Sequence, residues 1–331
     1  MIFVWFILAA IITVFASIKL STYADTIGEK SSLGGMLVGT IFLAGATSLP
    51  EVTTSISAIV LDSPDLAVGN VFGSNMFNLL ILASFDLYFR KQQIFQAAAH
   101  SHLYTASLGL LLAVVSLLAL SLQIPISFLG VGLDVWIILV TYALGMWLIS
   151  KRSQPTPDQA PADASTTGED YNFSGISLKK ATIGFIIAAL IIMGAGTLLT
   201  IAGDQIAVVT GLGASFVGSF LIALTTSLPE AIAVLVALQL RNHNLAIGSI
   251  LGSNLFNLLI LGATDIFYQS GPILSAVSSV HQITAAAVGI LSVITLYSLV
   301  RKKTNRSFRY GVPSIILIFI YFISSYLIFI Q

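Results

Sequence analysis

The amino-acid sequence predicts an all-α integral membrane protein with ten transmembrane helices in two inverted five-helix repeats. Three observations carry this prediction: the composition, the number of apolar segments and a duplicated motif. Of the 331 residues, 56% are hydrophobic and only 8% are charged, and the mean hydropathy is +0.98. This composition excludes a soluble globular protein. The sequence contains no cysteine, which excludes disulfides and thiolate metal sites.

Ten apolar segments are each long enough for a membrane span of about 20 residues. In chain order they cover residues 2–20, 32–60, 65–88, 95–122, 126–150, 179–202, 211–239, 244–268, 274–300 and 309–330. The first segment lacks a positively charged start, and its basic residue, Lys19, lies at its far end. We therefore expect an uncleaved span there rather than a signal peptide.

The positions of the basic residues support the count of ten spans. All 14 Lys and Arg residues fall in or beside the odd-numbered connections between the predicted spans. By the positive-inside rule these connections lie in the cytoplasm and both termini lie outside. An error of one span would place basic residues on both sides of the membrane. The small size and the short central linker indicate a prokaryotic cell membrane.

A polar linker divides the sequence into two domains. Residues 151–178 are rich in Pro, Ser, Thr and acidic side chains, and we expect a cytoplasmic, largely disordered segment. The first five-helix repeat covers residues 1–150, and the second, inverted repeat covers residues 179–331.

The two halves repeat one another at a constant offset of 179 residues. The motif TSLPE at Thr47–Glu51 returns at Thr226–Glu230, and GSNMFNLLIL at Gly73–Leu82 returns as GSNLFNLLIL at Gly252–Leu261. Each half contains an odd number of spans, so the second half crosses the membrane in the opposite sense. Transporters with inverted repeats bind their substrates near the membrane midplane, between the repeats.

The TSLPE motif places a carboxylate and a proline inside an apolar segment. A charged side chain at the centre of a membrane helix costs roughly 2.5 to 3.5 kcal/mol on insertion scales, and a bound cation would offset that cost. Thr47 and Glu51 share one helix face, with Ser48 beside them. Because Pro50 lacks an N–H and repels the carbonyl one turn earlier, we expect free backbone oxygens around Ala44 to Ala46.

The next predicted helix adds further oxygen donors to this set. Ser74 and Asn78 are four residues apart, whereas Asn75 is expected to pack between helices. The second half supplies the matching residues Thr226, Ser227, Glu230, Ser253, Asn254 and Asn257. Ca²⁺ takes six to eight oxygen ligands, and two glutamates neutralise its charge. The same oxygens can hold Na⁺, so competition for one site would give exchange.

The two TSLPE motifs, each followed by a GSN-x-FN helix, resemble the alpha repeats of the sodium/calcium exchanger family, within the cation/Ca²⁺ exchanger superfamily. The resemblance implies an alternating-access antiporter that exchanges Ca²⁺ for Na⁺. It implies that Glu51 and Glu230 bind Ca²⁺ directly. It also implies further oxygen ligands from Thr47, Thr226, Ser48 and Ser227, carbonyl donors at Ala44 and Ala223, and polar site positions at Ser74, Ser253, Asn78 and Asn257.

One pair of residues departs from the family pattern. Many members carry an aspartate at one of the positions that Asn78 and Asn257 occupy here, and potassium-dependent members use acidic groups there. Asparagine at both positions argues against potassium dependence and leaves Na⁺ or H⁺ open as the counter-ion.

Other functions remain open on the sequence alone. An H⁺/Ca²⁺ antiporter, or one for another divalent cation, would use the same site, and the repeat-matched His102 and His281 are candidates for proton coupling. A cation channel is a further alternative. An enzyme is not expected, because the sequence shows no catalytic pair and no cofactor motif.

Two further expectations concern charge and assembly. We expect Asp86 and Asp265, near predicted helix ends, to be solvated or paired with basic groups. We expect the protein to act as a monomer among membrane lipids, without nucleic acid.

Overall fold

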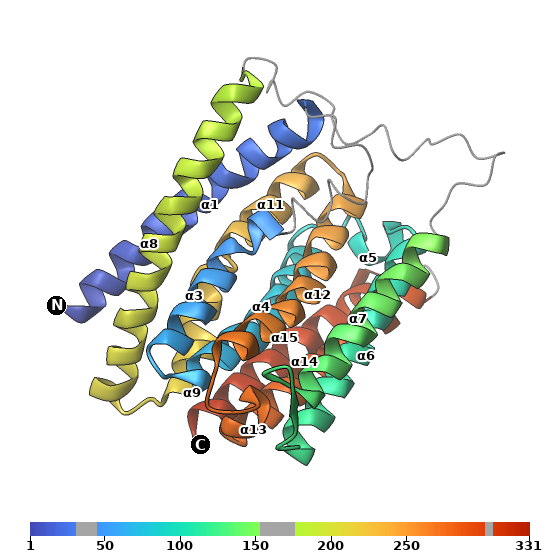
Figure 1. Cartoon of the computed structure of the whole chain (residues 1–331). Coiled ribbons are helices and arrows are strands. Elements are labelled where there is room, and N and C mark those ends of the chain that lie inside the picture. The colour runs from blue at the N-terminus through green and yellow to red at the C-terminus, as the bar shows by residue number, and fades with distance from the viewer. Residues whose placement is uncertain (31–44, 153–175, 302–306) are drawn as a thin grey trace.

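The computed structural model describes residues 1–30, 45–152, 176–301 and 307–331, which form one helical bundle (Figure 1). Within these ranges eight helices are long and apolar enough to cross a membrane, and a bent helix pair over residues 214–239 makes a ninth span. The helix Leu49–Val60 lies in the one remaining predicted span, 32–60, of which the structure describes residues 45–60. The prediction of an all-helical membrane fold is confirmed.

The first half contains α1 (Ile2–Lys30), α3 (Leu49–Val60), α4 (Pro64–Tyr88), α5 (Ile94–Ala97), α6 (Ser101–Leu122), β1 (Ser127–Phe128), β2 (Val131–Gly132) and α7 (Leu133–Arg152). The second half contains α8 (Leu178–Thr210), α9 (Ala214–Phe216), the π-helix η2 (Val217–Ile222), α10 (Ala223–Thr226), α11 (Leu228–Gln239), α12 (His243–Phe267), α13 (Ile273–Ala276), α14 (Val280–Val300) and α15 (Ser307–Phe329). Asn75 and Asn254 are 179 residues apart. The same offset separates the first residues, and also the last residues, of α3 and α11, of α4 and α12, and of α5 and α13.

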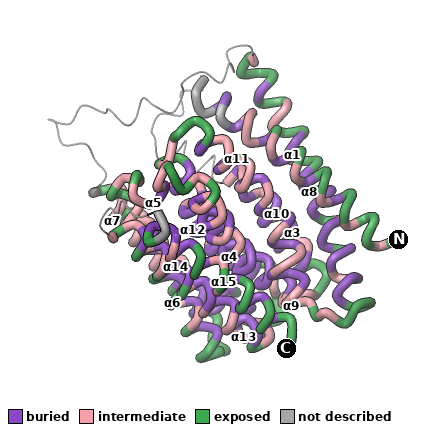
Figure 2. Tube along the Cα trace, turned by 180° about the vertical axis from the view of Figure 1, so that it is seen from behind, coloured by how far each residue is buried: buried purple, intermediate pink, exposed green. Residues whose placement is uncertain are grey.

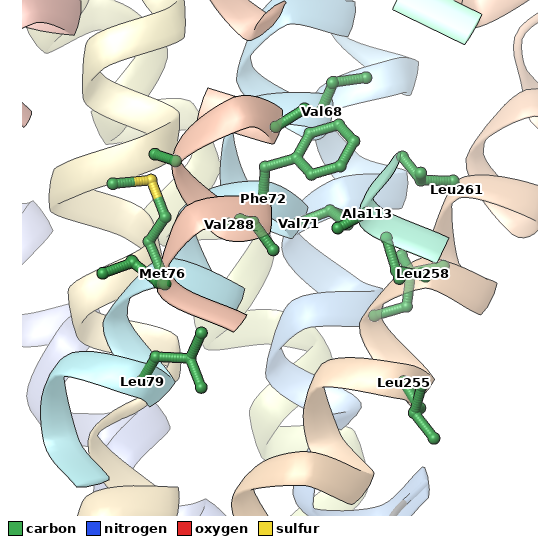
Figure 3. Packing of buried hydrophobic residues seen from close by; sticks show 14 of the residues in the cluster. Val68, Val71, Phe72, Met76, Leu79, Ala113, Leu255, Leu258, Leu261 and Val288 are labelled. Atoms are coloured by element: carbon green, nitrogen blue, oxygen red, sulfur yellow. The ribbon is translucent and has the colours of Figure 1, made fainter. Parts of the chain in front are cut away.

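Helices α4 and α12 form the centre of the bundle. In the most apolar part of α4, 89% of the residues are buried, and 67% in α12, compared with 17% in α1. Figure 2 shows this contrast between the buried interior and the exposed outer helices. Val68 and Phe72 of α4 belong to the same hydrophobic cluster as Leu258 and Leu261 of α12 (Figure 3). The two helices that carry the GSN motifs are therefore the most deeply buried elements.

Helices α1 and α8 pack along one another at one side of the bundle (Figure 1). Leu20 of α1 and Ile192 of α8 belong to a small hydrophobic cluster separate from the main core. Helix α8 has 33 residues, which corresponds to about 50 Å at 1.5 Å per residue. This length exceeds a hydrocarbon core of about 30 Å, so α8 must tilt or project from the membrane. The predicted spans 2–20 and 179–202 were too short.

The predicted span 126–150 also begins too early, because its first residues form a hairpin. Ser127 pairs with Gly132 across the antiparallel strands β1 and β2. Leu129 and Gly130 between the strands have φ values of 54° and 78°. Positive φ at both central positions is typical of the type I′ turn, whose twist suits a two-residue hairpin. Helix α7 therefore starts at Leu133.

The predicted spans 95–122 and 274–300 are likewise wrong at their starts, because α5 and α13 are separate short helices. At the start of α13, Ile273 N donates to Asp265 Oδ1 at 2.7 Å. The other oxygen, Asp265 Oδ2, accepts from Gly132 N of the first half at 2.6 Å. This carboxylate joins α12 and α13 to the hairpin before α7.

Asp86 makes the equivalent link at the end of α4. It accepts hydrogen bonds from Tyr310 and, at 2.5 Å, from Ser314 Oγ, both on α15 of the second half. Asp86 and Asp265 are 0% exposed. Neither aspartate is solvated, but Asp86 interacts electrostatically with Arg301, so the expected pairing with a basic group holds for Asp86. Each aspartate holds a helix end against the opposite half.

The backbones of α4 and the π-helix η2 are in direct contact at two glycines. A Cβ added at Gly69 would lie 3.0 Å from the carbonyl oxygen of Ser215. A Cβ added at Gly73 would overlap the backbone of Ser219 in η2. Such close approach is typical of membrane helix pairs with glycine at four-residue spacing. Gly73 precedes the site residue Ser74, so this contact also positions the GSN motif.

The close contact predicts that Gly73→Ala lowers the free energy of unfolding by about 1 to 3 kcal/mol, the usual result of overpacking a core. The measurement is the thermal unfolding midpoint of the purified protein in detergent. Gly194→Ala is the matched control, because Gly194 is exposed on α8 and no described atom lies within 4 Å of its Cβ position. Equal midpoints for the two variants would contradict the contact.

Candidate functional site

Each half breaks its helix at the serine of the TSLPE motif. Ser227 separates α10 from α11, and the two parts of that span differ in direction by 41°. Ser48 has φ −89° and ψ 11°, close to the −89° and 0° of Ser227. Pro50 and Pro229 lie in the first turn of the following helix, where a missing N–H leaves no hydrogen bond unmade. The prolines therefore start helices, and the expectation that Pro50 lies inside one is wrong.

Glu51 and Glu230 follow these prolines in the first turns of α3 and α11. Each is 1% exposed. The positive end of a helix dipole favours a negative charge at this position. The side chains of Thr226 and Ser227 interact with the Glu51 carboxyl group, and the two glutamate carboxyl groups interact electrostatically with each other. The two acidic residues of the duplicated motif thus come together from opposite halves.

Four asparagines join α4 to α12 symmetrically. Asn75 Nδ2 donates to the Asn254 carbonyl at 3.2 Å, and Asn254 Nδ2 donates to the Asn75 carbonyl at 3.3 Å. Asn78 Nδ2 then donates to Asn254 Oδ1 at 2.9 Å, and Asn257 Nδ2 donates to Asn75 Oδ1 at 3.0 Å. Asn75 and Asn254 therefore join the helices, as expected. The side-chain oxygens of Asn78 and Asn257 are left without a donor.

A second polar network connects α4 to both broken helices through Asn70. Its Nδ2 donates to Thr54 Oγ1 at 2.8 Å and to Ser55 Oγ at 3.0 Å, both on α3. Its Oδ1 accepts from Thr226 Oγ1 of α10 at 3.3 Å. Thr226 also lies 3.3 Å from Ser74 Oγ. This network fixes the position of Thr226, which interacts with Glu51.

Asn70 is absent from the site predicted from sequence. It lies four residues before Ser74 and eight before Asn78, so it shares their face of α4. That spacing is the signal that would have found it. The repeat did not point to it, because the matching residue in the second half is Ser249.

The site contains a concentration of buried oxygen atoms that lack hydrogen-bond donors. Among the described residues seven such atoms belong to predicted site residues: Ser48 Oγ, Glu51 Oε2, Asn78 Oδ1, Ser227 Oγ, both Oε atoms of Glu230, and Asn257 Oδ1. Buried polar atoms without partners are rare in proteins, because each carries an uncompensated desolvation cost. Five of these atoms, on the carboxyl and amide groups, are acceptors, and the two serine hydroxyls can accept as well as donate, so the group matches the requirement of a cation.

The remaining predicted residues have different surroundings. Thr47 is half-buried and Ser253 is buried. The Ala223 carbonyl accepts from Ser227 N at 3.0 Å and from Thr226 Oγ1 at 3.3 Å. Ala44 lies outside the described residues.

The donor set determines which ions suit the site. In the described part of the chain, no group of three or more His, Cys, Asp or Glu residues is placed to hold a metal ion. A cation here would therefore combine two carboxylates with neutral hydroxyl and amide oxygens. Hard oxygen ligands of this kind suit Ca²⁺ and Na⁺ and disfavour metals that prefer nitrogen or sulfur.

Comparisons with known proteins cover both halves. The family model described as sodium/calcium exchanger protein matches residues 1–150 and 180–330. CaxA of Alkalimonas amylolytica, a proposed antiporter, is 28% identical over 251 residues, which is 73% of this chain and 73% of that protein.

Two solved structures show the same fold. A structure of the sodium-calcium exchanger NCX_Mj matches with a TM-score of 0.58 and 20% identity, over 96% of this chain and 95% of that one. The H⁺/Ca²⁺ exchanger CAX matches with a TM-score of 0.64 and 13% identity, over 99% and 89%. At these identities the likeness supports the ten-helix fold alone.

The paired carboxylates generate a prediction about ion binding. We expect Glu51→Gln and Glu230→Gln each to weaken Ca²⁺ binding at least about 100-fold, because removing one partner of a buried charge pair costs about 3 to 5 kcal/mol. Isothermal titration of the purified protein with Ca²⁺ measures the effect. Asp62→Asn is the control, since Asp62 is an exposed carboxylate at a positive φ that asparagine tolerates. Unchanged affinity in both glutamine variants would exclude the two glutamates as ligands.

Proposed function

The chain belongs to the sodium/calcium exchanger protein family, and from this premise we propose that it exchanges Ca²⁺ for Na⁺ at the site around Glu51 and Glu230. It is a multi-pass membrane transporter of the cation/Ca²⁺ antiporter class, not an enzyme. The observation that carries the proposal is the group of seven buried oxygen atoms, contributed by both halves, for which the structure shows no hydrogen-bond partner among the described residues.

Charge and ligand number both favour Ca²⁺ as one substrate. Ionised Glu51 and Glu230 together carry the charge that neutralises one divalent cation. Seven unpartnered oxygens fall within the six to eight that Ca²⁺ takes, in the irregular geometry that it tolerates. Mg²⁺ requires a tighter octahedron and loses its water reluctantly, so it fits this set less well.

Burial of the glutamates favours exchange over a channel. Two ionised carboxylates without a cation repel one another, and their desolvation adds several kcal/mol per ion. Both glutamates are 1% exposed, so the protein switches most readily between its inward-open and outward-open states when a cation occupies the site. An ion released on one side is therefore replaced by another before the protein switches back. Channels instead line a pore with rings of repeated groups.

The neutral oxygens favour Na⁺ as the counter-ion. Protonation would neutralise Glu51 and Glu230, but Ser48, Ser227, Asn78 and Asn257 would still contribute four acceptors. Na⁺ ions would use these oxygens as ligands. The same two halves would then alternate between one Ca²⁺ and Na⁺ ions by alternating access.

An H⁺/Ca²⁺ antiporter is the second candidate. The H⁺/Ca²⁺ exchanger CAX and the sodium-calcium exchanger structure share this fold, so the fold does not separate the two counter-ions. In this reading the two glutamates would each carry a proton in the step without Ca²⁺.

The basic residues give the proposed orientation. The end of α7 and the start of α8, which flank the linker, lie at the upper end of the bundle in Figure 1, with the C-terminus at the lower end. Placing the upper end in the cytoplasm puts both termini outside. On this orientation an inward Na⁺ gradient would drive Ca²⁺ export from the cytoplasm.

Flux under separate gradients tests the counter-ion. In proteoliposomes at equal pH on both sides, we expect an imposed Na⁺ gradient to drive ⁴⁵Ca²⁺ flux, and Glu51→Gln or Glu230→Gln to abolish it. Asp62→Asn should retain it. Flux driven by a pH gradient without sodium, and indifferent to added sodium, would replace the Na⁺ proposal with the H⁺ one. Current that follows the Ca²⁺ gradient without counter-transport would indicate a channel.

Removing a neutral oxygen gives a second test. If Na⁺ uses the serine hydroxyls, Ser227→Ala should raise the Na⁺ concentration for half-maximal exchange roughly tenfold, taking about 1.5 kcal/mol for one charge-assisted contact. Ser57→Ala is the control, because Ser57 contacts Thr197 outside the site at 2.9 Å. An unchanged Na⁺ dependence in Ser227→Ala would contradict the assignment of this hydroxyl.

A further inference from the structure

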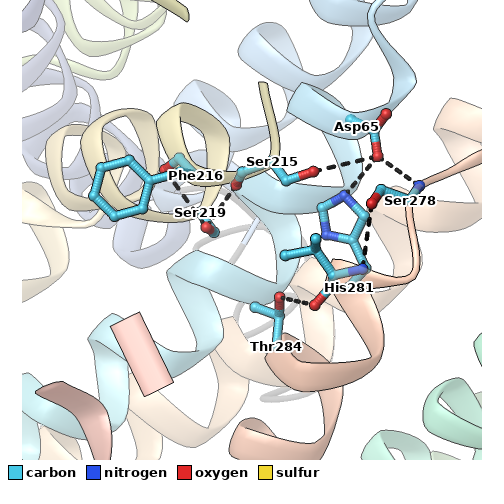
Figure 4. Close-up of polar contacts among 8 residues, drawn as sticks. Asp65, Ser215, Phe216, Ser219, Ser278, His281 and Thr284 are labelled. Carbon is cyan, nitrogen blue, oxygen red and sulfur yellow. Dashed lines mark hydrogen bonds and ion pairs between the residues drawn. The ribbon is translucent and has the colours of Figure 1, made fainter. Parts of the chain in front are cut away.

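A histidine and an aspartate form a hydrogen bond away from the glutamates, where three elements meet. Asp65 in the first turn of α4 accepts from His281 Nε2 of α14 at 3.0 Å, from Ser278 N before α14 at 2.7 Å, and from Ser215 Oγ of α9 at 3.4 Å. Figure 4 shows these side chains around the Asp65 carboxylate. The Asp65 side chain is 31% exposed, whereas His281 is fully buried. The carboxylate thus connects the buried imidazole to the surface.

His281 has one ring nitrogen without a partner. Its Nδ1 is buried and makes no hydrogen bond among the described residues. Histidine is the side chain whose ordinary titration range includes physiological pH. A neutral ring that donates from Nε2 leaves Nδ1 free to accept a proton, and the Asp65 carboxylate would balance the resulting charge.

At the opposite face of the membrane the matching residues make the same contacts, but an asparagine takes the place of the aspartate. The offset of 179 residues relates Asp65 to Asn244, His281 to His102 and Ser278 to Ala99. Ala99 N donates to Asn244 Oδ1 at 2.7 Å, the same distance as Ser278 N to Asp65. His102 also hydrogen-bonds Asn244. The backbone contact is therefore conserved between the halves, and the carboxylate is not.

No other charged group of the described chain takes part in this cluster. Of the elements packed against α14, α5 and the end of α6 near Gln282 contribute no ionisable side chain there. Arg301 and Arg309 lie at the other end of α14, where Arg301 donates to the Arg309 carbonyl at 3.1 Å. The proton balance at His281 therefore depends on Asp65.

We propose that the Asp65–His281 pair is a proton-binding site on one membrane face, which makes transport respond to the pH of that face alone. On the orientation proposed above, this face is the outside. A proton on His281 converts its hydrogen bond to the Asp65 carboxylate into an ion pair between two charged groups, which is stronger. It thereby strengthens contacts that hold α4, α9 and the start of α14 together.

Proton binding itself can be measured without any assumption about transport. The sequence has four histidines, so NMR of histidine-labelled protein in nanodiscs can follow each ring, with assignment by single substitutions. We expect the ring ¹⁵N shifts of His281 to follow a different pH dependence in Asp65→Asn than in the wild type, because the substitution removes the carboxylate that contacts Nε2. Asn244 in the equivalent position indicates that asparagine is tolerated there.

The reverse substitution is the matched control. Asn244→Asp should change the pH dependence of the His102 ring shifts and leave that of His281 unchanged. An unchanged pH dependence of His281 in Asp65→Asn, in a protein with the wild-type unfolding temperature, would overturn the proposal.

The effect on transport rests on the proposed function and is tested separately. In proteoliposomes with pH set independently on each side, acid on the Asp65 face should slow Ca²⁺ exchange about fivefold or more, the lower end of typical coupling between two sites. A single cysteine added at Gln331 reports orientation, because the chain has none. Asp65→Asn and His281→Gln should each remove this response, and Asn244→Asp should create one on the other face.

The outcomes separate the two proposals. Wild-type exchange with an unaltered pH response in Asp65→Asn would overturn the role of the pair in transport while leaving the exchange function intact. Absence of exchange in every variant would contradict the proposed function, and the NMR titration would still decide proton binding.

Discussion

The structure depends on the burial of two carboxylates at the centre of a membrane protein. Glu51 and Glu230 are almost completely removed from solvent, and the charged form of a buried carboxyl group is stable only with compensation. Part of that compensation comes from the helix breaks at Ser48 and Ser227, which give each glutamate a position in the first turn of a new helix. The neighbouring oxygen atoms without a hydrogen-bond partner do not offset the rest of the desolvation cost, so a bound cation is needed for it.

The surrounding fold holds these groups in place from two directions. The asparagine bridge between α4 and α12 fixes the amides of Asn78 and Asn257 by their nitrogens and leaves their oxygens available. The glycine contact at Gly73 brings η2 against α4, so that Thr226 reaches Asn70 and Ser74. Helix packing and the positions of the candidate ligands are therefore coupled, because the same short segments determine both.

The composition and the apolar segments were sufficient to predict the helical class, and the duplicated motifs selected Glu51 and Glu230, which the fold brings together. The errors came from features that hydropathy does not encode. An apolar count cannot place the breaks before Ser101 and Val280, beside which Ala99 N and Ser278 N donate to side chains of the opposite half. The hairpin before α7 depends on two positive φ values. Asn70 was not predicted as a site residue because it has no matching amide in the second half. A comparison of the two halves finds only residues that are present in both.

The mismatch between Asn70 and Ser249 has a consequence for the energetics of the transport cycle. If the halves were identical, exchanging their conformations would simply turn the molecule over in the membrane. In a symmetric bilayer without ion gradients, the inward-open and outward-open states would then be degenerate. Any resting preference for one of them must therefore originate at residues where the duplication has diverged. Asn70 is such a residue, because it ties α3 and α4 of the first half to α10 of the second half and has no matching amide.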